Sequence, residues 1–385
     1  MSVVADIVVI GGGPIGLAFA LAAHAQGRSV TVLEANIGAA SDTRTLALAA
    51  GSRLILRALG AWPDDTPATP INTIHVTQRG GFGQSILHAQ EFGVPALGYT
   101  LSYRALVVAL LARAQQCGLH IIDGATVSAV SNANDTGKIT YAREGAEQIC
   151  QAKLIVVADG GRSLTQLPSI KIEEKDYGQI ALLARLSSDW PHCNIAYERF
   201  TPTGPLALLP VGAEFGLVWT VTPDEAARIK ALRDEAFLAE FQDAFGGYAG
   251  KFSSVHSRFQ FPLRLRYAAQ SVAERMVLIG NAAQALHPVA GQGFNLGLRD
   301  ADQLAQILLD VAPDGDCGDV NLLRRYQRSR KPDTRAGIFF TDALVRGFSN
   351  DHAMLRVGRG AGLAALQMLP FARKRLARAM MFGRS

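Results

Sequence analysis

The chain has no apolar run long enough to span a membrane, although 49% of its 385 residues are hydrophobic. A membrane-spanning helix needs about 20 consecutive, mainly apolar residues. The segment from Met1 to Ile10 runs into a glycine-rich turn and not into a cleavage site. We therefore expect a soluble protein that stays on the cytoplasmic side.

Closely spaced cysteines are also missing. The four cysteines form no Cys-x-x-Cys pair, so neither a zinc site nor a redox dithiol is predicted, and we expect no bound metal. They are Cys117, Cys150, Cys193 and Cys317. Internal repeats and low-complexity linkers are absent too. The sequence thus favours reduced structural thiols and interleaved domains.

Acidic residues are scarce at the C-terminal end. Residues 351–385 hold seven Lys and Arg residues against one acid, Asp351, a net charge of +6, whereas the whole chain carries +5. The rest of the chain therefore carries −1. A basic tail on a near-neutral body favours an anionic partner, of which a lipid surface is one candidate.

A β-α-β unit with a glycine motif opens the chain. An apolar run from Val3 to Ile10 precedes Gly11-Gly12-Gly13-Pro14-Ile15-Gly16, a helical pattern follows to Ala25, and a second apolar run over Ser29–Leu33 ends at Glu34. In such a unit the glycines permit a tight turn and close approach to a pyrophosphate at the helix N-terminus, and the acid binds ribose hydroxyls. The pattern predicts dinucleotide binding without separating FAD from NAD.

The rest of the chain alternates between this fold and a second sheet. Helical spacing is seen in Arg44–Leu59, Leu101–Cys117, Ala231–Phe245 and Gly293–Leu309. Strands are expected at Thr73–Gln78, Leu119–Ile122, Ala125–Ser131, Lys153–Ala158, Ile180–Leu186, Ala196–Thr201, Leu206–Pro210, Gly216–Val221 and Met276–Ile279. We predict a nucleotide-binding α/β domain from 1–70, 99–168 and 269–334, a mostly antiparallel sheet domain from 71–98 and 169–268 that faces a cavity, and a helical segment over 335–385.

Two further motifs favour FAD. Val156 to Ser163 places Asp159, Gly160 and Gly161 in a turn after a strand, and Leu278 to Asp300 places a glycine-rich loop between a strand and a helix. The N–H groups and dipole of that helix can stabilise negative charge on a reduced flavin ring.

Together the three motifs resemble the p-hydroxybenzoate-hydroxylase fold of class A flavin monooxygenases. Four segments narrow the resemblance to the ubiquinone-biosynthesis hydroxylases, and within these the chain is most similar to the 2-polyprenyl-6-methoxyphenol hydroxylases. The segments are Arg44–Leu48, Tyr99–Arg104, Tyr197–Phe200 with Gly204–Pro210, and His287–Asp300. The resemblance runs from about Ala5 to the C-terminal helices.

The resemblance implies a set of FAD contacts. Gly11, Gly13, Gly16 and Glu34 would hold the adenosine half, Arg44 and Arg104 the phosphates and ribityl chain, Val127 the adenine through its backbone, Asp159 with Gly160 the nucleotide groove, Asn281 the ribityl chain, and Pro288, Gly291, Gly293, Phe294 and Asn295 the isoalloxazine. The wider fold usually has Asp at the position of Asn281. An amide keeps an acceptor oxygen but loses the charge, which predicts weaker FAD binding and a different flavin potential.

Alternatives stay open at several of these residues. Arg44 and Arg104 are either cofactor ligands or members of surface salt bridges. Asp159 either serves the cofactor or caps its own turn.

The family chemistry is hydroxylation of a phenol through a flavin C4a-hydroperoxide, with NAD(P)H as electron donor and O₂ as co-substrate. His287 is the candidate proton relay and the Pro288 carbonyl a candidate contact to the phenol, whereas the structural alternative is a histidine that only shapes its loop. Three functions remain in view: hydroxylation of a polyprenylated phenol, hydroxylation of a soluble phenol, and a flavin-binding subunit of a biosynthetic complex without catalysis of its own.

Partners follow from these functions. We expect a prenylated phenol, an anionic membrane surface at the basic C-terminal segment, and a multi-enzyme ubiquinone complex, but no nucleic acid. The tail, from Leu363 to Phe382, either rests on lipid, docks a partner subunit or only covers the core.

Overall fold

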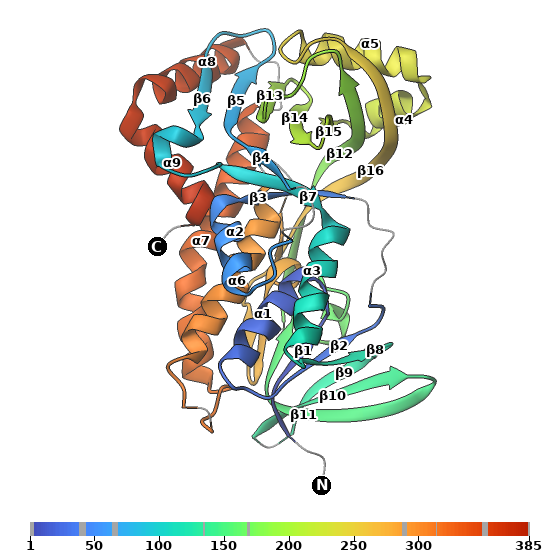
Figure 1. Ribbon diagram of the computed structural model, residues 1–385, viewed down its shortest axis with the longest axis vertical. Helices are drawn as coiled ribbons and strands as arrows, with labels where there is room; N and C mark the ends of the chain where they lie inside the picture. Colours follow the sequence, from blue (N-terminus) through green and yellow to red (C-terminus); the bar gives the residue numbers. More distant parts are fainter. Residues whose placement is uncertain are drawn as a thin grey trace.

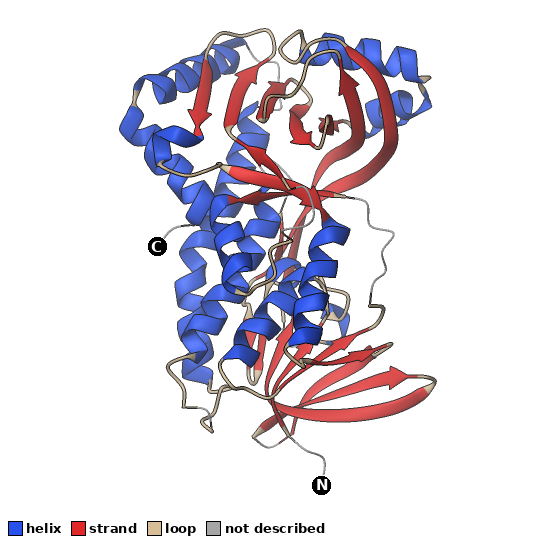
Figure 2. Ribbon diagram, in the orientation of Figure 1, coloured by secondary structure: helices blue, strands red, loops and turns tan. Residues whose placement is uncertain are grey.

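The computed structural model describes residues 4–37, 44–63, 68–133, 135–167, 170–286, 291–312, 314–348 and 353–383. Two large sheets lie at opposite ends of an elongated molecule, a small sheet lies between them, and helices run along one side (Figures 1 and 2).

The first large sheet contains the expected β-α-β unit. Its central strand β1 pairs in parallel with β2 and β11, and β11 pairs in parallel with β18. Parallel strands covered on both faces are apolar along their length, which explains the valine and isoleucine runs. The strands are β1 (Ala5–Ile10), β2 (Val30–Glu34), β8 (His120–Asp123), β9 (Thr126–Ala133), β10 (Thr136–Arg143), β11 (Ala146–Val157), β17 (Val272–Ala273) and β18 (Met276–Leu278).

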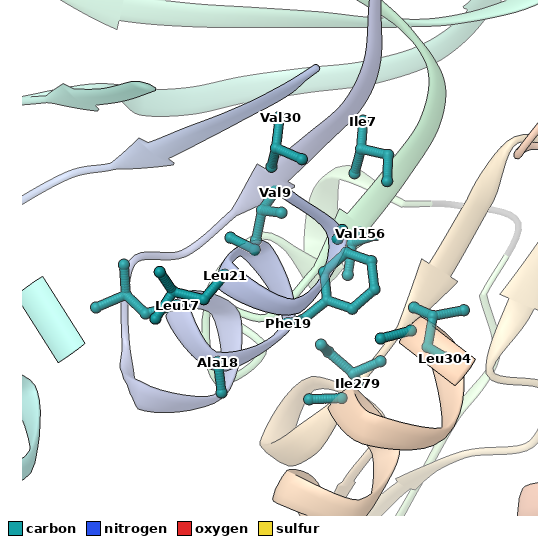
Figure 3. Packing of buried hydrophobic residues seen from close by; sticks show 14 of the residues in the cluster. Ile7, Val9, Leu17, Ala18, Phe19, Leu21, Val30, Val156, Ile279 and Leu304 are labelled. Atoms are coloured by element: carbon teal, nitrogen blue, oxygen red, sulfur yellow. The ribbon is translucent and has the colours of Figure 1, made fainter. Parts of the chain in front are cut away.

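Helices α1 (Pro14–Ala25), α3 (Tyr103–Gln116) and α6 (Gln292–Leu308) build the core on one face of this sheet. Phe19 of α1 is fully buried and lies near Val156 of β11 and Ile279 (Figure 3). Burying a side chain of this size contributes about 1.5–3 kcal/mol.

The second large sheet is mostly antiparallel, as predicted, with one parallel pair between β5 and β13. Its strand order is β19 (Gln284–Ala285), β16 (Phe252–Ala268), β12 (Ile172–Ser188), β15 (Glu214–Val221), β14 (Gly204–Val211), β13 (Ile195–Thr201), β5 (Thr73–Gln78) and β6 (Gln84–His88). One face packs under α4 (Pro223–Ala231) and α5 (Asp234–Phe245), whose Phe237, Phe241 and Phe245 are buried against it. The single helix predicted over Ala231–Phe245 is wrong at its start, because α4 ends at Ala231 and a new helix begins at Asp234.

A small sheet links the two large ones, and it was not predicted. In it β7 (Gly98–Ser102) lies between β3 (Thr45–Ala49) and β4 (Thr69–Ile71). The helix predicted over Arg44–Leu59 therefore forms only as α2 (Ala50–Ala58), and the helix predicted from Leu101 begins at Tyr103, capped by the Ser102 hydroxyl. Antiparallel pairing of β3 with β7 overrides the helical propensity of the Thr45–Ala49 segment.

The C-terminal part is helical, as expected: α7 (Val320–Phe348), α8 (Ala353–Met368) and α9 (Pro370–Phe382). On α9, Ala377 and Met381 are buried against Ala50 of α2 and Leu97. Among the described residues no helix combines the length and hydropathy needed to cross a membrane.

Candidate functional site

The glycine-rich turn joins β1 to α1. At Gly11 (φ 107°) an added Cβ would lie 2.6 Å from the Asp159 Cα, and at Gly16 it would lie 2.0 Å from the Gly11 carbonyl oxygen. Packing within the protein thus requires glycine at both positions. At Gly13 the nearest atom to an added Cβ is the Tyr103 hydroxyl oxygen, at 3.6 Å. Packing does not require glycine at Gly13, which leaves the helix end open to a ligand.

The N-terminus of α1 suits a pyrophosphate. Gly13 is its N-cap, and no side chain caps the helix, so its first N–H groups keep their partial positive charge. The Glu34 carboxylate accepts hydrogen bonds from the backbone N–H groups of Gly12 (2.6 Å) and Asn36 (3.0 Å). A carboxylate has about four acceptor positions, so Glu34 retains capacity for ribose hydroxyls.

Arg44 and Arg104 are both neighbours of Tyr103, which lies close to the glycine-rich turn. The Arg44 guanidinium carbon is 5.5 Å from the centre of the Tyr103 ring, whose hydroxyl approaches Gly13. Arg104 is the second residue of α3 and its side chain is exposed. Within the described ranges no carboxylate lies within 4.0 Å of Arg104, so the salt-bridge alternative gains no support there.

Val127 lies near a backbone hydrogen bond to Glu34, whereas the Asp159 carboxylate is turned toward its own loop. Val127 lies at the start of β9, next to the Ala125 N–H that donates to the Glu34 carbonyl oxygen (2.9 Å). The Asp159 carboxylate accepts from the Gly161 N–H (2.8 Å) and the Ser163 N–H (2.7 Å). Both Asp159 oxygens therefore stabilise their own turn, as in the capping alternative, and a cofactor contact remains a prediction.

Arg266 connects the second and third motifs. Its Nη2 atom donates to the carbonyl oxygens of Gly160 (2.5 Å) and Asn281 (3.3 Å). Gly280 has a φ of 60°, and the Asn281 side chain that follows it is exposed. The amide of Asn281 is thus accessible to a ligand. No sequence motif marks Arg266, because the β16 segment around it matches none.

The N-terminus of α6 is held in place by Asn295. Its Oδ1 atom accepts from the Ala49 N–H (2.8 Å) and the Ser52 hydroxyl (2.7 Å), and its Nδ2 atom donates to the carbonyls of Ala47 (3.0 Å) and Gly291 (2.7 Å). The side chain is therefore fully used in joining α6 to β3 and α2. A flavin contact through Asn295 remains a prediction for its backbone alone.

Two glycines and a phenylalanine complete the start of α6. Gly291 is the N-cap, with a φ of 61°, and no side chain caps the helix. An added Cβ at Gly293 would meet no atom within 4 Å. Phe294 is partly buried against the first core. A contact between this helix N-terminus and the isoalloxazine stays a prediction. His287 and Pro288 lie outside the described residues.

A buried ion network joins Asp300, the last residue of the third motif, to α7, whose Arg330 carries no sequence signal. Asp300 of α6 accepts from the Gly280 N–H (3.1 Å), from Gln284 (2.5 Å) and from Arg330 of α7 (2.7 Å). Arg330 also pairs with Asp333 (3.0 Å). Burial lowers the pKa of Arg330, but the carboxylates of Asp300 and Asp333 outweigh this effect and hold its pKa above the ordinary value. The network fixes the loop at Gly280 against two helices.

Known proteins are similar to this chain in sequence and in fold. A family model described as FAD binding domain matches residues 4–340. The ubiquinone hydroxylase UbiL of Rhodospirillum rubrum is 35% identical over 376 residues, which cover 95% of this chain and 87% of that protein. The 3-demethoxyubiquinol 3-hydroxylase of Escherichia coli is 31% identical, with 94% of each chain covered.

A solved structure shows the same fold. The p-nitrophenol 4-monooxygenase PnpA from Pseudomonas putida superposes with a TM-score of 0.82 at 18% identity and full coverage of both chains. The expected fold class and the expected use of FAD are confirmed. The chain belongs to the family of FAD-dependent aromatic hydroxylases that includes the ubiquinone hydroxylases.

Proposed function

We propose that this protein hydroxylates the aromatic ring of a polyprenylated phenol in ubiquinone biosynthesis, with O₂ and NAD(P)H as co-substrates. The observation that carries the proposal is the identity of 35% and 31% to two ubiquinone hydroxylases over nearly the whole chain. A substrate of the 2-polyprenyl-6-methoxyphenol type is our first candidate. One fold serves many phenols, so the ring position must come from an experiment.

The residues support a specific arrangement of FAD. The adenosine half and the pyrophosphate are bound by Gly11, Gly13, Gly16 and Glu34. The phosphates and the ribityl chain are bound by Arg44 and Arg104, and the ribityl hydroxyls also by Asn281. The adenine lies against Val127, and the nucleotide groove is bordered by Asp159 with Gly160. The start of α6, from Gly291 to Asn295, lies along the isoalloxazine. Both helix N-termini in this arrangement lack a side-chain cap, which is the observation that favours it.

The bound flavin supplies the oxygen transfer, and the chain must orient the ring and exclude water. His287 and the Pro288 carbonyl stay our candidates for proton relay and phenol contact.

The C-terminal helices support docking on an anionic membrane, where a polyprenylated substrate resides. At the junction of α8 and α9, Met368 and Phe371 are 79% and 78% exposed. Lys374, Arg375 and Arg378 are exposed on α9, while Ala377 and Met381 are buried. One face of α9 thus covers the core and another presents basic and apolar side chains, a combination that suits an anionic lipid surface.

The experiment that tests the function is mass spectrometry of lipid extracts from an aerobically grown strain that lacks this protein. Accumulation of a 2-polyprenyl-6-methoxyphenol with loss of ubiquinone supports the proposal and identifies the step. Accumulation of another prenylated phenol would mean that the protein catalyses hydroxylation at a different ring position. An unchanged profile contradicts the pathway and favours a soluble phenol.

A second measurement tests the alternative that this protein is a flavin-binding subunit without catalysis of its own. The purified protein is expected to oxidise NAD(P)H faster when a prenylated phenol is added, and to place one atom of labelled O₂ in the product. Flavin binding without either effect would favour a subunit that acts through a partner.

A further inference from the structure

Glu198 lies at the middle of one face of the second large sheet. The register places Leu183, Val218, Ala207, Glu198 and Val76 side by side across β12, β15, β14, β13 and β5. We call this set the Glu198 row. The opposite face carries Tyr197, whose ring centre is 5.5 Å from that of Phe245 of α5. The Glu198 row therefore faces away from α4 and α5.

The residues of the Glu198 row are partly exposed, whereas those of the adjacent row are buried. All five residues of the Glu198 row keep partial contact with solvent. The adjacent row on the same face is buried throughout; it consists of Ala181, Thr220, Pro205, Phe200 and Gln78. Of these two rows, the Glu198 row is the one that a ligand can reach.

This face is directed toward the flavin end of the molecule. Ile74, on the same face of β5, packs in the cluster that contains Ala50, the first residue of α2. At the end of β14 the Thr100 hydroxyl of β7 donates to the Pro210 carbonyl. Strand β7 pairs with β3, which Asn295 joins to the start of α6. Figure 1 shows β13, β14 and β15 on the side of β3 and β7 away from α6.

Glu198 is the only acid in these two rows, and its immediate neighbours, Ala207 and Val76, cannot donate a hydrogen bond. Within the described part of the chain no donor contacts its carboxylate, and burial raises its pKa to about 8. A partly buried carboxylate without a donor costs free energy. A bound ligand with a hydroxyl group would supply the missing partner.

Other charged groups near this face have partners elsewhere or lie at its edge. Arg359 of α8 donates to Gln78 (3.3 Å), and Lys175 of β12 pairs with Asp342 of α7. Arg185 lies at the corner of the array, opposite Gly216. Burial alone accounts for the raised pKa of Glu198.

We propose that Glu198 is a catalytic residue that accepts the proton of the substrate's phenolic hydroxyl. The inference rests on the proposed function. In this step the phenolic O–H bond breaks, a new O–H bond forms on the carboxylate, and the electron pair stays on the phenolic oxygen, where it activates the ring carbon for oxygen transfer. A phenol has a pKa near 10, so a carboxylate of raised pKa is a much better matched base than an ordinary glutamate.

The test compares Glu198→Gln with Glu214→Gln. Glu214 lies on β15 of the same sheet and accepts from His256 (2.8 Å) and Ser187 (3.1 Å). Product formation at saturating prenylated phenol is measured from pH 6 to pH 9.5, together with FAD content. In the wild type and in Glu214→Gln the rate should rise with a midpoint near pH 8. In Glu198→Gln the rise should vanish and the rate should fall about 10²- to 10⁴-fold.

Chemical rescue separates proton transfer from a structural role. A fluorinated prenylphenol has a lower pKa and can lose its proton to solvent in place of the Glu198 carboxylate. It should restore most of the rate of Glu198→Gln and change the wild-type rate little. An unchanged pH profile, or no rescue, overturns the assignment of Glu198. If Glu198→Gln does not fold, Glu198→Asp keeps the acid and should retain the pH-dependent rise. A wild-type protein that hydroxylates no prenylated phenol overturns the proposed function itself, which is a different outcome from an active Glu198→Gln.

Discussion

Asp300 of α6 and Arg330 of α7 form an ion pair at 2.7 Å between two side chains that are 2% and 9% exposed. Because Asp300 also holds the Gly280 N–H, this pair connects the packing of two helices with the loop that precedes Asn281.

Removing one partner of that ion pair should destabilise the folded protein. We expect Arg330→Met to lower the free energy of unfolding by about 3–5 kcal/mol, because it leaves a buried carboxylate without its counter-charge. Urea denaturation measures this change, and the purified variant should also lose FAD. The matched control is Arg325→Met: Arg325 and Asp310 are 47% and 64% exposed, so the loss should stay below about 1 kcal/mol. Equal effects would contradict a special role of the buried pair.

Two glycines of the first motif should respond differently to alanine. Gly16→Ala places a Cβ against the Gly11 carbonyl and should destabilise the protein even without FAD. Gly13→Ala meets no atom closer than 3.6 Å, so the apoprotein should keep its melting temperature while FAD affinity falls. Thermal melts of the apoproteins and flavin titrations give both values. Unchanged FAD affinity in Gly13→Ala would count against a pyrophosphate at this helix end.

Asn295 and Asn281 should also respond differently to replacement by alanine. Asn295→Ala removes the hydrogen bonds to the Ala49 N–H, the Ser52 hydroxyl and the carbonyls of Ala47 and Gly291, so the free energy of unfolding should fall by roughly 1–3 kcal/mol or more. Asn281→Ala removes an exposed amide and should leave folding unchanged while FAD binds more weakly. Urea denaturation and FAD titration distinguish the two. If Asn281→Ala binds FAD normally, Asn281 does not contact the cofactor.

The raised pKa of Glu198 predicts how stability changes with pH. From about pH 4.5 to pH 8 the unfolded chain has lost a proton that the folded protein still holds, so this group reduces stability as the pH rises, by at most about 1.4 kcal/mol per pH unit. Relative to the wild type, Glu198→Gln should therefore gain stability between pH 5 and pH 8. Glu214→Gln should not, because His256 lowers the pKa of Glu214. Parallel stability curves for the wild type and Glu198→Gln would contradict the pKa assignment.

Membrane docking can be tested with vesicles. Replacing Lys374, Arg375 and Arg378 by serine should abolish cosedimentation with phosphatidylglycerol vesicles, since each basic residue near an anionic surface contributes about 1 kcal/mol. Lys230→Ser, on the exposed surface of α4, serves as the control and should bind like the wild type. Wild-type protein that stays in the supernatant would favour the alternative in which the basic face meets a partner subunit.

The sequence predicts those parts of the fold that local patterns determine. The β-α-β unit, the start of α6 and the alternating strands of the second sheet follow from apolar periodicity and glycine positions. Strand β3 could not be predicted, because its conformation depends on pairing with β7, far along the chain. The division into domains stays a prediction.

The candidate site divides in the same way. Glycines with positive φ leave a signal in the sequence, as at Gly11 and Gly291. Arg266 and Arg330 act through contacts made only after distant segments meet, so no motif marks their roles.

The strand order of the first sheet has a consequence for synthesis on the ribosome. Strand β11 is hydrogen-bonded to β1 on one side and to β18 on the other, and β18 follows only after strands β12 to β16 of the second sheet have been made. Until then the open edge of β11 can pair with other chains. A nascent chain that stalls before Met276 should therefore depend on chaperones to escape aggregation.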